Sequence, residues 1–147
     1  MKYTTEVTID LPRSKVIELF DSVENMYQWQ EGLKSYEHLE GDPGCEGSRS
    51  EMVYEGRKGD LRMTETITKR NLPHEFHGIY EAKGVYNEMY NYFIETDSGS
   101  TTWRTLSVFR FRGLMALMAP FMKQAFTGNT LLNMERFKEF CEQREKI

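Results

Sequence analysis

Apolar and polar residues alternate at the start of the chain and again through its middle, which is typical of half-buried β-strands. In residues 2–10, Tyr3, Thr5, Val7 and Ile9 share one side, and polar or charged residues occupy the other. Six further strands are predicted, at residues 34–40, 47–56, 61–70, 75–83, 85–96 and 100–112. Short Gly-, Pro-, Asn- and Asp-containing links separate them, and such links favour antiparallel hairpins because parallel pairing needs long crossovers.

Helical spacing interrupts this strand pattern twice. After Pro12, which suits a first helical turn, apolar residues predict a short helix, and Ser22 is the expected N-cap of a second one that ends before Gly32. From residue 114 to 145, apolar residues recur every three or four positions. Pro120 and Gly128 are expected to kink or interrupt this last helix.

Length and composition narrow the class of protein. A chain of 147 residues is expected to form one domain, and a formal net charge of −4 argues against a nucleic-acid partner. Cys45 and Cys141 lie far apart and in no metal-ligand spacing, and the N-terminus has no signal-peptide pattern. No apolar run is long enough to span a bilayer. We therefore expect a cytoplasmic protein without a metal or other cofactor.

The order of these elements resembles the START-like (SRPBCC) superfamily over the whole chain, residues 1–147. The segments that carry the resemblance are Thr8–Val16, Met26–Trp29 and Phe109–Gly113. The resemblance implies an α+β helix-grip fold, in which a curved antiparallel sheet of about seven strands wraps around the long C-terminal helix and two short helices follow the first strand. It also implies a hydrophobic cavity between sheet and helix. Members bind lipids, sterols, hormones or polyketides, and a minority catalyse cyclisation or dehydration.

The register of the last hairpin decides which side chains face such a cavity, since a one-residue slip reverses every assignment. Asp97-Ser98-Gly99 fits a three-residue loop with glycine in the left-handed position, which sets Phe93 opposite Trp103. A two- or four-residue loop would instead turn Tyr86, Tyr90, Tyr92 and Ile94 toward the inner aromatic face. With the three-residue loop, the predicted ligand-binding lining is Tyr54, Met63, Glu65, Ile67, Tyr80, Asn87, Met89, Asn91, Phe93, Trp103, Phe109, Phe121, Met122, Ala125 and Phe126.

The polar residues within this lining are the candidates for orienting a ligand or for catalysis. Glu65 on an apolar strand face is costly unless it is paired or protonated. It is either a pocket acid that orients a ligand or moves a proton, or a carboxylate satisfied by an arginine or a tyrosine hydroxyl. Asn87 and Asn91 could share one ligand or bond to protein groups, and Trp29 and Trp103 are interpreted as core residues.

Two other segments have competing interpretations. The spacing His74-x-x-His77 resembles a metal motif, but alternation sends the two imidazoles to different sides and no third ligand is close in sequence. The methionines around Pro120 could plug the cavity, form a portal, touch a membrane or make a dimer contact.

The leading functional hypothesis is non-catalytic binding of a hydrophobic or aromatic small molecule that is lipid-, sterol- or polyketide-like. One alternative is a polyketide cyclase/dehydratase-like enzyme that uses Glu65 as acid or base, assisted by Asn87, Asn91 or Tyr80. Another is an interaction protein that forms a homodimer or partner face through Tyr86, Tyr90 and Tyr92. The sequence does not identify the ligand.

Overall fold

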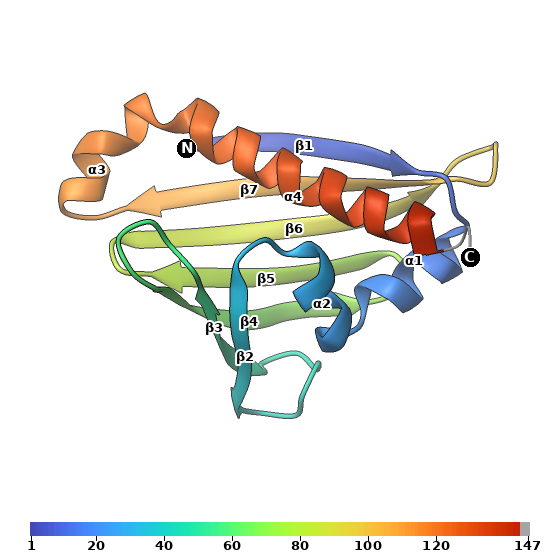
Figure 1. The fold of residues 1–147 in the computed structure, drawn as a ribbon, viewed down its shortest axis with the longest axis horizontal. Helices are drawn as coiled ribbons and strands as arrows, with labels where there is room; N and C mark the ends of the chain where they lie inside the picture. Colours follow the sequence, from blue (N-terminus) through green and yellow to red (C-terminus); the bar gives the residue numbers. More distant parts are fainter. Residues whose placement is uncertain (145–147) are drawn as a thin grey trace.

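The computed structural model describes residues 1–144, in which seven strands form one antiparallel sheet with the order β1-β7-β6-β5-β4-β3-β2 (Figure 1). The strands are β1 (Lys2–Ile9), β2 (Leu33–Glu40), β3 (Arg49–Tyr54), β4 (Leu61–Asn71), β5 (Glu75–Ala82), β6 (Val85–Glu95) and β7 (Thr101–Phe111). The helices are α1 (Arg13–Phe20), α2 (Val23–Trp29), α3 (Leu114–Met118), the 3₁₀ turn η1 (Ala119–Phe121) and α4 (Lys123–Arg144). This confirms the expected helix-grip architecture, and each predicted strand agrees with the observed one to within two residues.

The predicted helix boundaries are confirmed at Ser22 and Pro120 but not at Gly128. The Ser22 Oγ accepts a hydrogen bond of 3.1 Å from the Asn25 backbone N–H, as an N-cap does. Pro120 lies in η1, where it separates α3 from α4. Gly128 lies inside the continuous helix α4, so the expected interruption there is wrong. Glycine lowers helix stability by only about 1 kcal/mol and keeps its N–H, so the hydrogen-bond ladder continues through it.

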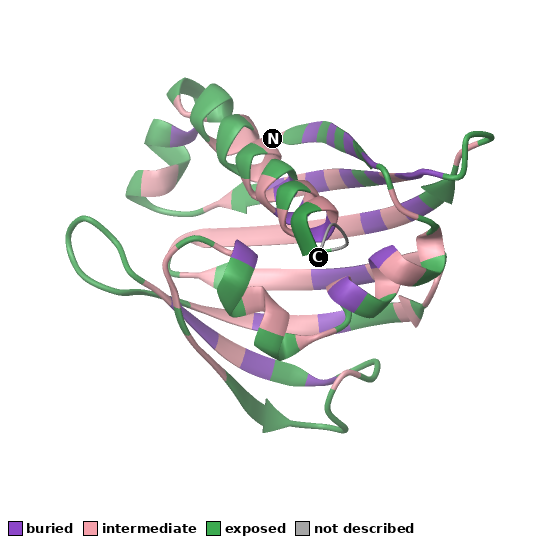
Figure 2. Ribbon diagram, turned by 45° about the vertical axis from the view of Figure 1, so that its right-hand side comes forward, coloured by how far each residue is buried: buried purple, intermediate pink, exposed green. Residues whose placement is uncertain are grey.

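The register of the last hairpin is the one that a three-residue loop predicts. Phe93 lies opposite Trp103, Asn87 lies opposite Phe109, and Gly99 has the required positive φ of 84°. Tyr86, Tyr90 and Tyr92 therefore belong to the outer face of the sheet, away from the helices. Figure 2 shows buried and more exposed residues alternating along β1 and β7.

The core occupies one end of the inner face, where α1, α2 and the C-terminal half of α4 meet the sheet. Phe137 of α4 lies at its centre, with ring centroids 5.0 Å from Trp29 and 5.3 Å from Trp103. The ring of Phe20 from α1 lies 4.9 Å from that of Phe93. We call this end the packed half; its buried residues are Val7, Ile9, Val16, Leu19, Trp29, Phe93, Trp103, Met134, Phe137 and Cys141.

The long helix α4 covers the sheet unevenly. It packs chiefly against β1 at one edge and against α2, and it runs across the upper part of the sheet (Figure 1). Its fully buried residues, Met134, Phe137 and Cys141, all lie in its second half. No helix within residues 1–144 is long and apolar enough to cross a membrane.

Removal of the Phe137 ring is expected to destabilise the fold strongly. Phe137→Ala leaves a cavity between Trp29, Trp103 and Phe20, and we expect the free energy of unfolding to fall by about 3–5 kcal/mol. Urea denaturation followed by tryptophan fluorescence measures this change. Leu132→Ala, at an exposed position of the same helix, is the control and should cost less than about 1 kcal/mol. Equal losses in the two variants would contradict the placement of the core.

Candidate functional site

A second half of the inner face is only partly covered by helices. The register aligns Glu65, Tyr80, Asn87 and Phe109 in one row across β4 to β7. Phe109 contacts Phe126 of α4 at a ring distance of 5.1 Å, so this row faces the helix. Several of its side chains and their neighbours nevertheless keep partial solvent exposure, unlike those of the packed half. We call this region the uncovered half; its partly exposed residues are Tyr36, Tyr54, Met63, Tyr80, Asn87 and Met89.

Glu65 is the buried polar centre of the uncovered half. Its side chain is almost inaccessible to solvent, at 6% exposure. The Tyr36 hydroxyl donates a hydrogen bond of 2.5 Å to Glu65 Oε1, and the Tyr80 hydroxyl donates one of 2.8 Å to Oε2. Within residues 1–144, no Lys, Arg or His forms an ion pair with this carboxylate. The structure thus confirms that Glu65 is satisfied by tyrosine hydroxyls, each oxygen by one donor.

The tyrosines around Glu65 are held in their neutral, hydrogen-donating form. Burial raises the pKa of Tyr36, Tyr54 and Tyr80 well above the usual value, and the negative charge of Glu65 raises all three further. The Tyr54 hydroxyl donates to Oε1 of Gln30, which follows α2 directly. Because a phenolate beside Glu65 is disfavoured, these groups act as donors and not as bases.

Asn87 adds an acceptor without a partner to the same row. Its Oδ1 is buried, and it receives no hydrogen bond from the residues that the structure describes. A buried amide oxygen without a donor costs about 1–3 kcal/mol, so such groups call for an explanation. A hydroxyl or amine of a bound molecule would supply the missing donor.

Apolar side chains surround these polar groups. The rings of Phe109, Phe111 and Phe126 lie within 5.6 Å of one another and join β7 to the start of α4. Met63 and Met89 are half-buried, whereas Met52 and Ile67 are fully buried. The region therefore combines a mostly apolar surface with a few polar groups, which is the usual character of a small-molecule site.

Five of the predicted lining residues belong elsewhere. Phe93 and Trp103 lie in the packed half, and Asn91 accepts hydrogen bonds from the Trp103 Nε1–H at 2.9 Å and the Thr105 hydroxyl at 2.7 Å. All three positions have the predicted inward parity, but Phe93 packs against Phe20 of α1 and Trp103 against Phe137 of α4, and the Asn91 amide is occupied by side chains of β7. Phe121 is 90% exposed and Ala125 is also exposed, because η1 and the first turn of α4 extend beyond the sheet. The inward prediction is wrong for both.

Sequence reasoning missed Tyr36 and Gln30. Tyr36 lies on β2, whose irregular pairing with β3 between Leu33 and Ser35 obscures simple alternation. Gln30 lies in the connection after α2 and has no periodic signal at all. Tyr36 could have been found as a large aromatic residue on a strand next to Met52, its partner in the register.

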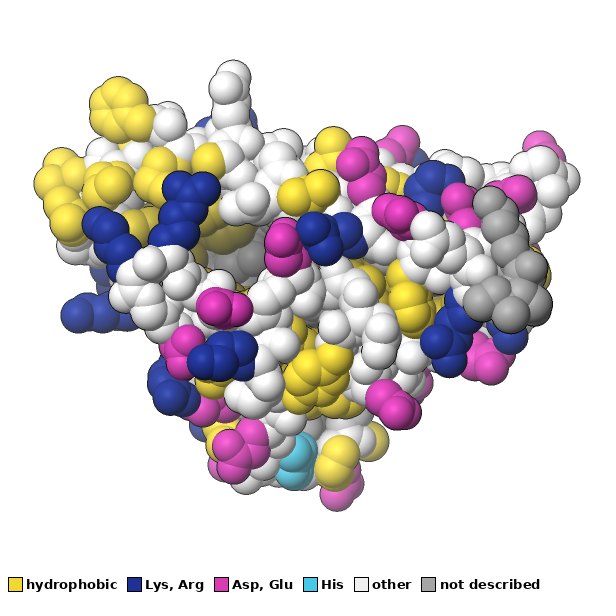
Figure 3. Space-filling model, viewed as in Figure 1, with side chains coloured by type: hydrophobic (Ala, Val, Ile, Leu, Met, Phe, Trp, Pro, Cys, Tyr) yellow, Lys and Arg dark blue, Asp and Glu magenta, His cyan; other side chains and the backbone are white. Residues whose placement is uncertain are grey.

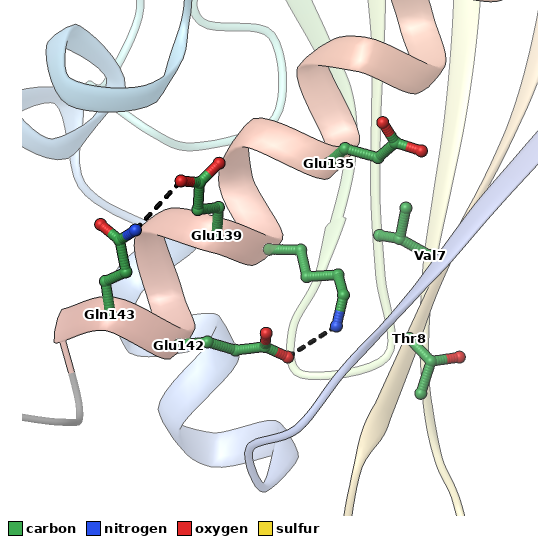
Figure 4. A pocket seen from close by; sticks show the side chains of 7 residues that line it. Val7, Thr8, Glu135, Glu139, Glu142 and Gln143 are labelled. Atoms are coloured by element: carbon green, nitrogen blue, oxygen red, sulfur yellow. Dashed lines mark hydrogen bonds and ion pairs between the residues drawn. The ribbon is translucent and has the colours of Figure 1, made fainter.

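Two pockets lie outside the predicted lining. A groove of about 410 Å³ runs between β1 and α4 (Figure 4), and two of its four charged residues, Lys138 and Glu142, form an ion pair of 2.7 Å. The second pocket, of about 510 Å³, lies at the β5–β6 turn and is lined by Val85, Phe111 and Arg112 among others. The residues predicted to line an interior cavity contribute to neither pocket.

His74 and His77, which have a metal-like spacing, interact with different partners. His74 Nδ1 lies 3.3 Å from Arg13 Nη1. His77 Nε2 lies 2.7 Å from Glu75 Oε2, and its Nδ1 accepts a hydrogen bond of 3.1 Å from the Asn91 backbone N–H. This second bond makes Nε2 the protonated nitrogen of a neutral His77. The pair therefore does not form a metal site.

Comparison with known proteins supports the fold and places the chain in a broad group. The family described as "Polyketide cyclase / dehydrase and lipid transport" matches residues 1–142. No functionally curated protein sequence matches the chain.

Solved structures with the same fold share little sequence with the chain. Zhui aromatase/cyclase from a Streptomyces species is 15% identical, with a TM-score of 0.82 over 98% of this chain and 94% of that one. The protein TTHA0849 from Thermus thermophilus is 14% identical, with a TM-score of 0.79 over 98% and 99%. Ara h 8.0201 is 14% identical, with a TM-score of 0.74 over 97% and 98%.

The tyrosine cluster around Glu65 is expected to make the fold sensitive to alkali. A tyrosine with a raised pKa keeps its proton in the folded protein, whereas in the unfolded chain it ionises near pH 10. Above that pH the unfolded chain binds fewer protons, so the free energy of unfolding falls as pH rises, by up to about 1.4 kcal/mol per pH unit for each such tyrosine. Tyr80→Phe should reduce the slope of this fall by up to about 1.4 kcal/mol per pH unit, which is the contribution of one tyrosine. Urea unfolding between about pH 10 and pH 11.5 measures the slope. Identical slopes would contradict the burial of the Tyr80 hydroxyl against Glu65.

Proposed function

The chain belongs to the polyketide cyclase / dehydrase and lipid transport family of the START-like superfamily, and on this premise we propose that it binds a hydrophobic or aromatic small molecule between the sheet and α4. The expected ligand is lipid-, sterol- or polyketide-like, and its contact surface is the uncovered half of the inner face. The observation that carries the proposal is the coexistence there of partly exposed apolar side chains with the buried, unpartnered Oδ1 of Asn87.

The chemistry of this surface specifies an amphipathic ligand. Met63, Met89 and the rings of Phe109, Phe111 and Phe126 offer contacts for an apolar body. Methionine side chains adapt to irregular shapes, which suits a surface that must fit a guest. At the other end of the row, Glu65 and the Asn87 amide oxygen can both accept hydrogen bonds. A ligand with one hydroxyl group on an otherwise apolar skeleton satisfies both requirements.

Filling the uncovered half should abolish binding. Met89 points inward between Gly78 and Ser107, so Met89→Trp places an indole where we expect the ligand. The dissociation constant of the fluorescent hydrophobe 1-anilinonaphthalene-8-sulfonate should rise at least about tenfold, a loss of about 1.4 kcal/mol. Val108→Trp, on the outer face of β7, is the matched control and should leave this constant unchanged.

Native mass spectrometry of the purified protein provides the companion measurement. Wild type and Val108→Trp should carry a co-purifying or added apolar molecule, and Met89→Trp should not. Thermal unfolding of the three proteins distinguishes loss of the site from loss of the fold. Equal probe binding by wild type and a folded Met89→Trp variant would place the ligand elsewhere, and the proposal would fail.

A second candidate function is polyketide cyclase-like catalysis, which the convergence of Glu65, Tyr80 and Asn87 on one row favours. A fold neighbour, the Zhui protein, is described as an aromatase/cyclase. In this proposal the Glu65 carboxylate removes a proton from a methylene between two carbonyl groups. The resulting enolate carbon attacks a carbonyl carbon of the same polyketide molecule. The protonated Glu65 then returns the proton to the alkoxide oxygen.

Replacement of Glu65 separates binding from catalysis. Glu65→Gln keeps the shape and the acceptor toward Tyr36 but removes the base, so turnover of a poly-β-ketone substrate should fall at least about a hundredfold. Binding of the fluorescent hydrophobe should stay within about threefold of wild type, because the apolar surface is unchanged. Glu51→Gln, on the outer face of β3, is the control. Unchanged turnover in Glu65→Gln would exclude a catalytic role for Glu65.

A further inference from the structure

The segment between β7 and α4 exposes a group of large apolar side chains at one end of the molecule. Leu114 is 71% exposed, Leu117 73% and Phe121 90%, and Met118 and Pro120 are exposed beside them. We call these five residues the apolar lip. α3 and η1 extend past the strands at this end (Figure 1), and Figure 3 shows hydrophobic side chains gathered over them.

The lip has a defined conformation that directs these side chains outward. Ala119 is buried, and Met115 packs against the β5–β6 turn, where its side chain lies within 3.3 Å of the position a Cβ would take at Gly84. The Arg112 backbone N–H donates to the Gly84 carbonyl at 3.0 Å, which ties the start of the segment to the same turn. One side of the segment is therefore anchored to the sheet, and the opposite side carries Leu117 and Phe121. Apolar side chains held outward in this way mark a contact surface.

The charged residues that flank the lip in sequence are all basic. Residues 98–134 contain no Asp or Glu, although the whole chain has a net charge of −4. Arg110, Arg112 and Lys123 flank the lip in sequence and are exposed, and the exposed Lys83 precedes the Gly84 turn. Glu81 is the acidic residue in the pocket at this end, and it shares that pocket with Arg110 and Arg112. Figure 3 shows dark blue side chains next to the hydrophobic group.

We propose that the apolar lip docks this protein onto the surface of an anionic lipid membrane. Leu117 and Phe121 enter the boundary between headgroups and acyl chains, and Arg112 and Lys123 contact the lipid phosphates. Apolar insertion and cation attraction are the two contributions that hold a peripheral protein at a bilayer surface. The attraction falls with salt because it acts over about a Debye length.

A second copy of this protein would fit this surface less well than an anionic membrane. A symmetric contact would bring Arg112 and Lys123 of one protomer against the same residues of the other, and residues 98–134 contain no Asp or Glu to offset them. An anionic bilayer neutralises these cations instead. The lip also leads into the uncovered half, since Phe126 lies in the first turns of α4 after it and packs on Phe109 and Phe111.

Vesicle co-sedimentation tests the proposal without any knowledge of the ligand. Wild type is incubated with vesicles of pure phosphatidylcholine, or with phosphatidylcholine containing about a third phosphatidylglycerol, at low and high salt. We expect binding to the anionic vesicles that weakens at high salt. The double variant Leu117→Ser/Phe121→Ser should reduce the partition coefficient more than about tenfold. Arg112→Gln/Lys123→Gln should reduce it about thirtyfold on anionic vesicles only.

Matched controls separate the lip from general surface effects. Arg62→Gln/Arg104→Gln removes the same two charges from side chains paired with Glu51 and Glu6, and Leu39→Ser removes an exposed apolar side chain on β2. These variants should bind anionic vesicles like wild type. Three results would overturn the proposal: no vesicle binding by wild type, binding that the lip variants leave unchanged, or a lip-dependent dimer in sedimentation velocity without vesicle binding. Probe binding by a lip variant measures the interior site separately, so the two proposals can fail independently.

Discussion

The structure depends on the contact between the second half of α4 and the sheet. Phe137 inserts between Trp29 and Trp103, and Met134 and Cys141 are buried one helical turn to either side. Once α4 is fixed there, its first half contacts β1 through the Tyr3 hydroxyl and β7 through the rings of Phe126 and Phe109. The inner surfaces of β3 to β6 are then left without an equally close cover. Uneven coverage by one rigid helix thus divides the inner face into a packed half and an uncovered half.

Burial of Glu65 in the uncovered half imposes a second constraint. A buried carboxylate is tolerated only if donors replace the water it has lost. Here Tyr36 and Tyr80 supply one hydroxyl to each oxygen, from strands on opposite sides of β4. The carboxylate in turn keeps both phenols protonated. The cluster is therefore satisfied without a cation, while the buried Oδ1 of Asn87 in the same row receives no hydrogen bond from the residues that the structure describes.

The two proposals describe adjacent parts of one surface. The apolar lip lies where β7 passes into α4, and the rings of Phe109, Phe111 and Phe126 lie immediately behind it. A hydrophobic molecule that leaves a bilayer at the lip would meet an apolar path toward Glu65 and Asn87. The charged groove between β1 and α4 lies at the other end of α4, where Glu135, Glu139 and Glu142 disfavour an apolar guest.

The sequence by itself predicted the elements and their order, and it favoured the register of the last hairpin, and with it the inward parity, that the structure confirms. These follow from local rules: side chains alternate along a strand, and the glycine at position 99 selects the loop that aligns Phe93 with Trp103. The tertiary structure alone decided which inward residues lie free and which lie in the core. Phe93 and Trp103 share their parity with Asn87 and Met89, but only Phe93 and Trp103 lie in the packed half, and Asn91 is occupied by hydrogen bonds within the sheet. The outward position of Phe121 and the pairing of Tyr36 with Glu65 likewise depend on contacts between elements distant in sequence, which periodicity does not encode.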